Sequence, residues 1–266
     1  MYETGETLFE APNWGPDGSL VINAKGLLWE LPAAGGTPVQ IAAEHLPPVN
    51  NDHVLSPDGA TIYASANDWH IYAVPRHGGP ATRVSMDDGR MHFLHGISPD
   101  GTALAYVALE PEGDNWWAHA NVRLLATDTS WDIGLTDSSR PDDGPEFSPD
   151  GQWIYFNTEV FTTAPGHAQI ARISLDGSDL QRLTHSDVVD WFPHLSPNGT
   201  HAVHLSFPTG TTGHPENKPV SLKIIELPAW DEPSATIELF GGQGTINVGS
   251  WNPEGTEFAY VAYPQS

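Results

Sequence analysis

The segment Ser56-Pro57-Asp58-Gly59-Ala60-Thr61-Ile62-Tyr63 joins a tight turn to a β-strand. Proline presets φ at the second turn position, aspartate hydrogen-bonds back to the backbone, and glycine accepts the left-handed conformation. The β-branched and aromatic residues that follow favour an extended strand. Variants of this turn recur along the chain, so the sequence encodes a repeated unit; the six copies occupy residues 15–18, 56–59, 98–101, 148–151, 196–199 and 252–255.

The spacing of the six turns defines the size of the unit. The copies begin at residues 15, 56, 98, 148, 196 and 252, which gives spacings of 41, 42, 50, 48 and 56 residues. Further strand-like runs follow the first one in each unit, as in residues 70–74 and 79–84, so each unit holds about four strands. Repeats of this length with four strands are typical of propeller blades. We therefore expect a single all-β domain over residues 1–266, folded as a six-bladed β-propeller.

The ends of the chain indicate how the ring would close. Only one clear strand follows Gly255, so the sixth unit lacks its outer strands. Residues 6–9 (Glu-Thr-Leu-Phe) precede the first unit and resemble an outer strand. We expect this N-terminal strand to complete the last blade, which would hold both termini and remove an exposed sheet edge.

The composition excludes several classes of function. Asp and Glu number 34 against 10 Lys and Arg, for a formal charge of −24, which argues against nucleic acid and anionic membrane surfaces as partners. The chain has no cysteine, which excludes disulfides, thiolate nucleophiles and cysteine-ligated metals. No stretch approaches the roughly 18 apolar residues of a membrane span. The start of the chain lacks the features of a secretory signal, so a cytoplasmic location is expected.

The order of elements within a unit resembles a known family. A Ser-Pro-Asp-Gly turn and a strand are followed by a second strand of the type His70-Ile71-Tyr72-Ala73-Val74 and by a Gly-Gly turn. This order resembles the WD40-like repeat of the TolB-type propellers over residues 5–266. The resemblance implies the propeller fold, and it leaves the chemistry open because many functions share the motif.

Three insertions indicate where a binding site would lie. In a propeller, the loops that join the second and third strands lie on the face opposite the repeated turn, around one mouth of the central channel. The longest insertions are of this type, and decorated loops on one face of a repeat fold commonly form binding sites. They comprise residues 110–119, 161–167 and 207–219.

Four side chains precede the repeated turns in neighbouring units and predict a metal site. His53 and His95 lie three residues before their turns, whereas Glu146 and His194 lie two residues before theirs, each after a proline. Imidazoles and a carboxylate gathered at the channel axis would suit a divalent ion such as Zn, Mn, Ni or Fe. The alternative is that these side chains form hydrogen bonds between packed blades.

A second resemblance concerns the composition of this site. Metal-dependent oligogalacturonate lyases are also propellers, and His53, His95, His194 and Gln243 resemble their metal centre by residue type. This similarity implies β-elimination on a uronic-acid-type sugar. The metal would bind the sugar carboxylate, and a side-chain base would remove the adjacent proton.

The mouth loops and inner strands supply further candidates. His214 or His167 would be the base, and Asp143 would take part in catalysis or orient the substrate. Arg140 would either clamp a carboxylate or pair with a neighbouring aspartate. The remaining predicted substrate contacts are polar or aromatic side chains of the same regions: Asn51, Asp52, Trp191, Lys218, Gln243 and Asn247.

Two functions of different classes are compatible with these residues. The first is a carbohydrate-active enzyme, a metal-assisted lyase or glycoside-cleaving enzyme, with a small-molecule or oligosaccharide substrate at the channel mouth. The second is a non-catalytic TolB-like propeller that holds a peptide or protein partner there. The first predicts a bound metal, and the second predicts none.

Overall fold

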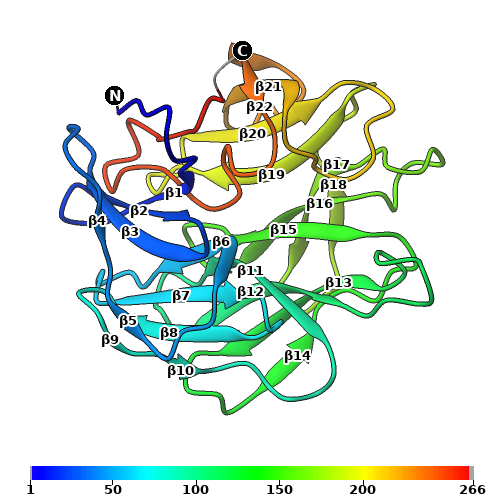
Figure 1. Ribbon diagram of the computed structural model, residues 1–266. Coiled ribbons are helices and arrows are strands. Elements are labelled where there is room, and N and C mark those ends of the chain that lie inside the picture. Colours follow the sequence, from blue (N-terminus) through cyan, green and yellow to red (C-terminus); the bar gives the residue numbers. More distant parts are fainter. Residues whose placement is uncertain (1, 264–266) are drawn as a thin grey trace.

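The repeated strands form an all-β propeller in the computed structural model, which describes residues 2–263. Five four-stranded antiparallel sheets follow one another around a ring (Figure 1). Within residues 2–263 no helix combines the length and the apolar character that a membrane crossing requires. The strands of the five blades are β1 (Glu10–Trp14), β2 (Ser19–Ala24), β3 (Leu27–Pro32) and β4 (Val39–Gln40); β6 (Val49–Leu55), β7 (Thr61–Ala66), β8 (Ile71–Pro75) and β10 (Thr82–Arg83); β11 (Met91–Ile97), β12 (Ala103–Leu109), β13 (Ala120–Ala126) and β14 (Asp132–Gly134); β15 (Asp142–Phe147), β16 (Trp153–Thr158), β17 (Gln169–Ser174) and β18 (Leu180–Arg182); and β19 (Val189–Leu195), β20 (His201–Phe207), β21 (Lys218–Glu226) and β22 (Pro233–Gly241).

The repeated turn has the geometry that its sequence predicts. In the second blade Gly59 N–H donates to the carbonyl of Ser56 at 2.7 Å, and Gly59 adopts a φ of +70°. The Ser56 hydroxyl donates to Asp58 at 2.6 Å and accepts from the Thr61 amide at 2.9 Å. The turn therefore fixes the start of the next strand. A short parallel pair, β5 (Ala43–Glu44) with β9 (Gly79–Pro80), joins the first two blades outside the main sheets.

The expectation of six blades is wrong for the described residues, which contain five. The sixth repeat forms only an isolated bridge between Trp251 and Phe258 around its turn. It begins with a Gly-Gly-Gln-Gly segment that disfavours a regular strand, and no strand of residues 2–263 pairs outside Phe258. The repeat still fills the wall of the ring, because Ile246 and Val248 are fully buried.

The predicted closure by the N-terminal segment is also not found. Residues 6–9 form no strand, and they line a cavity of about 1380 Å³ together with residues 256–263. Phe9 packs on Trp29 of the first blade, with ring centroids 5.7 Å apart, in a cluster that Ala259 of the sixth repeat also joins. The ring is instead closed by β1, where the Ala11 amide donates to the carbonyl of Gly244 at 2.8 Å.

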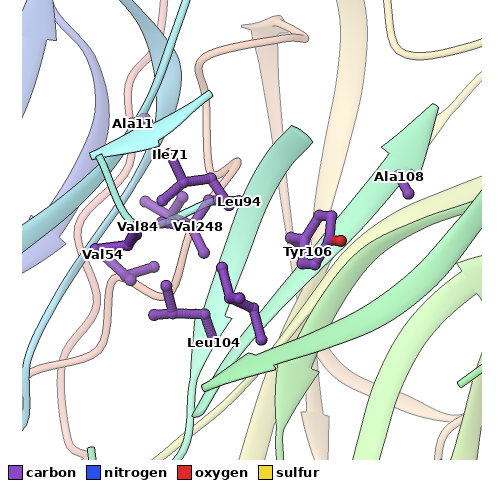
Figure 2. Close-up of a cluster of buried hydrophobic side chains, with 10 residues drawn as sticks. Ala11, Val54, Ile71, Val84, Leu94, Leu104, Tyr106, Ala108 and Val248 are labelled. Atoms are coloured by element: carbon purple, nitrogen blue, oxygen red, sulfur yellow. The ribbon is translucent and has the colours of Figure 1, made fainter. Parts of the chain in front are cut away.

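The core lies between blades. Figure 2 shows one cluster in which Ala11, Val54, Leu94 and Val248 bring together three blades and the sixth repeat. Such blade-to-blade burial of apolar side chains is the main stabilising force of the ring. Tyr106 lies at the border of this cluster, with its hydroxyl directed away from the aliphatic side chains (Figure 2).

Candidate functional site

Every inner strand of the five blades carries a β-bulge at the level of the predicted site. The register of the strand shifts in β1, β6, β11, β15 and β19 relative to the neighbouring strand. In three of these strands the residue before a proline adopts a positive φ: 50° at Ala11, 61° at Gly144 and 53° at Phe192. A bulge turns a side chain to another direction, so residues at different distances from the turn can face the same region.

Asp143 is the centre of the buried polar cluster. Its Oδ1 atom lies 3.1 Å from Nε2 of His95, and its Oδ2 atom lies 3.6 Å from Nε2 of His214. These three residues come from β11, β15 and the long loop before β21. The fold therefore brings together three residues that the sequence assigns to different roles: His95 as a metal ligand, Asp143 in catalysis or substrate orientation, and His214 as a base.

His214 differs from its neighbours in having a partly exposed side chain, although its ring nitrogen Nδ1 is buried and has no hydrogen-bond partner. Its side chain is 16% exposed, whereas those of His95 and Asp143 are nearly buried. Its Nε2 atom faces the carboxylate, and a ring that carries its hydrogen on Nε2 would leave the lone pair on Nδ1, which has no hydrogen-bond partner. The ring is held by aromatic contacts, with centroid distances of 4.6 Å to Trp191, 5.1 Å to Phe192 and 5.9 Å to Trp117.

The charges of this cluster are strongly coupled. Burial by itself would lower the pKa of His95, but the carboxylates of Asp52 and Asp143 outweigh it and raise this pKa to about 9. Burial would raise the pKa of Asp143, yet hydrogen bonds from His214 and His95 hold it well below its usual range. For Asp52 burial dominates and raises the pKa. The core of the site is an imidazolium–carboxylate pair, His95 with Asp143, beside the ring of His214.

The stability of the protein should fall at alkaline pH because of His95. The pKa of His95 is about 9 in the folded state, above its value of roughly 6.5 in an unfolded chain. Its contribution is therefore complete below about pH 6.5 and is lost as the pH rises through about 9. Urea unfolding across this range should show the decline, and His95→Gln should remove most of it. An equal decline in that variant would contradict the assignment.

The predicted metal ligands do not form a common set of donors. Nδ1 of His194 lies 2.5 Å from a Glu146 oxygen, and Nε2 lies 2.5 Å from the carbonyl of Ile246, so neither nitrogen is free. His53 lies 3.3 Å from a backbone carbonyl through Nε2, and burial lowers its pKa to about 4. Among the described residues, metal-ligand spacing occurs elsewhere, in a group that contains none of His53, His95, Glu146 and His194.

The predicted substrate residues fall into two groups. Asn51 and Asp52 contact the sixth repeat, because Gln243 reaches Asn51 at 3.4 Å and Asn247 reaches Asp52 at 3.5 Å. These four amide and carboxyl groups thus adjoin the Asp143 cluster through Asp52. The second group consists of residues that do not join this network.

In that second group, Lys218 is exposed at the start of β21, and Arg140 forms no ion pair within residues 2–263. The predicted pairing of Arg140 with an aspartate is therefore not seen. Trp191 is only 2% exposed, so its ring packs on His214 and is closed to a ligand from solvent. His167 lies 3.0 Å from the carbonyl of Ser186, away from the Asp143 cluster.

The long loops pack on one another over this region. A Cβ atom on Gly166 would meet the Thr211 carbonyl oxygen at 2.9 Å, and one on Gly242 would meet the Pro215 carbonyl oxygen at 2.1 Å. The loop that carries His214 is thus in close contact with the fourth blade and with the sixth repeat. Trp116, which is 51% exposed, precedes Trp117, whose ring contacts that of His214.

Sequence reasoning did not find a second cluster, formed by Asp88, His92 and Asp132. His92 resembles an ordinary inner-strand residue, and Asp132 is 40 residues away in the chain. Only the spacing Asp88 to His92 could have drawn attention to it, and two residues at such a spacing are a weak signal.

Comparison with known proteins shows related chains with this fold. No known family profile matches the sequence. The uncharacterized protein Atu1656 of Agrobacterium fabrum is 37% identical over 270 residues, which cover 99% of this chain and 87% of that protein. A solved structure from Agrobacterium tumefaciens, presented as a TolB, is also 37% identical, with a TM-score of 0.88 over 98% of this chain and 91% of that chain.

Two solved structures at lower identity share the fold alone. TolB from Acinetobacter baumannii is 18% identical, with a TM-score of 0.63, and the match covers 93% of this chain and 56% of that chain. An oligogalacturonate lyase in complex with manganese is 12% identical, with a TM-score of 0.59 over 92% of this chain and 68% of that chain. At such identities the similarity shows a shared propeller fold, and it does not show a shared chemistry of the site.

Proposed function

The chain belongs to the TolB-like β-propeller family, and from that premise we propose that it is an enzyme that cleaves an oligosaccharide by acid–base chemistry at the channel mouth. The observation that carries the proposal is the buried, unpartnered Nδ1 of His214, whose other ring nitrogen faces the carboxylate of Asp143. A buried carboxylate that fixes the tautomer and orientation of an imidazole is the usual way to prepare a histidine base.

The proposed reaction is a β-elimination on a uronic-acid-type sugar. Nδ1 of His214 is buried, so the loop that carries it must move to admit the sugar. Nδ1 then removes the proton next to the sugar carboxylate, the electrons of that C–H bond form a C=C bond, and the C–O bond to the leaving sugar breaks. The same imidazolium returns the proton to the leaving oxygen, so atoms and charges balance. Lys218, four residues after His214 and exposed, is the cation available for the sugar carboxylate.

His95 has a supporting role in this scheme. Its Nε2 donates to Asp143, and its Nδ1 lies 3.2 Å from the carbonyl of Asn247, so both nitrogens are engaged. It therefore keeps Asp143 ionised and in place and does not itself exchange a proton with the substrate. Since His194 and Glu146 are bound to each other, the proposed steps use no metal held by the predicted ligands.

Peptide binding is the second candidate function, and the surface beside the site favours it. Trp116 is half exposed and adjoins Trp69, with ring centroids 6.1 Å apart. Exposed tryptophans of this kind are typical anchors for a protein or peptide partner. A peptide held there would need none of the acid–base geometry at His214.

Activity measurements distinguish the two candidates. The protein would be incubated with oligogalacturonate and other uronic-acid oligosaccharides, and the unsaturated product followed by its ultraviolet absorbance. We expect turnover that falls at least about 100-fold in His214→Gln. The matched control is His185→Gln, since that exposed histidine pairs only with Asp231.

Three outcomes would contradict the scheme in different ways. No turnover of any substrate, together with saturable binding of a peptide, would favour the second candidate. Equal activity in His214→Gln and in the wild type would reject the assigned base. Loss of activity with a chelator and its recovery with manganese would show that a metal takes part.

A further inference from the structure

A second polar cluster lies outside the channel, where the second blade meets the third. It consists of Asp88 in the loop that joins these blades, His92 on β11, and Asp132 at the start of β14. One ligand atom from each residue lies within 4.8 Å of the other two. We propose that these three side chains bind a divalent first-row metal ion that the channel chemistry does not require.

His92 presents a free ligand atom to this cluster. Its Nδ1 lies 2.8 Å from the carbonyl of Trp69, which can only accept, so Nδ1 carries the hydrogen and Nε2 holds the lone pair. The side chain is fully buried, yet Nε2 has no hydrogen-bond partner. An orphaned buried nitrogen costs free energy unless a partner satisfies it, and a metal ion would be that partner.

The two carboxylates are positioned by hydrogen bonds from outside the cluster. Asp132 accepts from Nε of Arg123 at 2.9 Å and from the Tyr106 hydroxyl at 2.7 Å. Asp88 accepts from the amide of Arg90 at 3.0 Å and from its guanidinium at 2.7 Å. Each carboxylate oxygen retains a second lone pair. Metal ligands in proteins are commonly oriented by such outer partners, with the histidine N–H on a carbonyl and the carboxylates hydrogen-bonded.

The set of donors selects the class of ion. One imidazole nitrogen and two carboxylate oxygens suit borderline ions such as Zn²⁺ or Mn²⁺, whereas Ca²⁺ and Mg²⁺ favour sites built from oxygen alone. Asp88 Oδ1 now lies 3.6 Å from Nε2 of His92. Since the side chain of Asp88 is 23% exposed, that side chain can rotate to close the site. The ion would then hold the loop between two blades to the outer strand of the third blade.

Metal titration of the whole chain tests this site. After chelator treatment and its removal, ZnCl2 and MnCl2 would each be titrated by calorimetry, with the melting temperature measured in parallel. We expect one equivalent to bind and the melting temperature to rise, because an ion that binds only the folded state stabilises it. Asp88→Asn and His92→Gln should each weaken binding at least about tenfold.

Matched variants separate this site from other donors. Asp87→Asn makes the same change at the adjacent, largely exposed residue and should leave the affinity unchanged. His214→Gln should also leave it unchanged, which distinguishes this site from the channel. The proposal is overturned if the wild type shows no saturable binding or if Asp88→Asn binds as tightly as Asp87→Asn. If His92→Gln fails to fold, the comparison of Asp88→Asn with Asp87→Asn decides the test, because Asp88 is partly exposed.

Discussion

Replacing Asp143 by asparagine is expected to lower the kcat of the proposed lyase by about three orders of magnitude, with a smaller change in KM. One oxygen of the carboxylate lies 3.1 Å from Nε2 of His95, and the other faces Nε2 of His214 at 3.6 Å. An amide has only one accepting atom, so it can serve one imidazole and must direct its NH2 group at the other. If the NH2 group faces His214, the hydrogen of that imidazole moves from Nε2 to Nδ1, and Nδ1 no longer has a lone pair. Steady-state kinetics of the variant measure the effect.

A readout besides activity separates this role from a general loss of structure. Without the negative charge of Asp143, burial should lower the pKa of His95 from its value of about 9, which an NMR titration would detect. Asp142→Asn is the matched control, because burial raises the pKa of Asp142 to about 7 and an uncharged side chain there is a small change. A kcat that stays within about tenfold of the wild type in Asp143→Asn would reject the dyad.

The repeated turn allowed the fold class to be predicted, but it did not determine the number of blades. Proline, aspartate and glycine act within four residues, so the turn at Ser56 forms from local preferences alone. Whether a sheet forms depends on pairing with other strands, and the part of the sixth repeat that the structure describes offers Phe258 no outer strand. Residues 6–9 do not form this outer strand, and Phe9 packs on Trp29 of the first blade.

The candidate site was predictable as a set of residues and not as a geometry. The sequence indicates that polar side chains of the inner strands face one region, and the structure places His95, Asp143 and His214 in contact. Alternation along a regular strand cannot predict these contacts, because each inner strand is interrupted by a bulge. The positive φ of Phe192 is a further surprise, since a bulky residue rarely adopts it.

Glu146→Ala is expected to reduce the free energy of unfolding by about 3 kcal/mol, because it removes a contact between blades that nothing else replaces. Glu146 accepts from the Leu195 amide at 2.8 Å and contacts His194 at 2.5 Å. His194 continues the chain of contacts to the carbonyl of Ile246, and its own carbonyl accepts from Trp251. The sixth repeat has no complete sheet, so these contacts hold it to the ring. Urea unfolding measures the loss.

Two control variants decide what the loss means. Glu146→Gln keeps an oxygen for the Leu195 amide and should lose only about 1 kcal/mol. Asp231→Ala removes a carboxylate from an exposed pair with His185 and should cost almost nothing, because solvent screens such pairs. If Glu146→Ala unfolds at the same urea concentration as Asp231→Ala, the blades do not depend on this contact. If Glu146→Ala lowers the free energy of unfolding by about 3 kcal/mol, Glu146 and His194 have a structural role. That role explains their positions before the repeated turns, which the sequence analysis interpreted as a metal site.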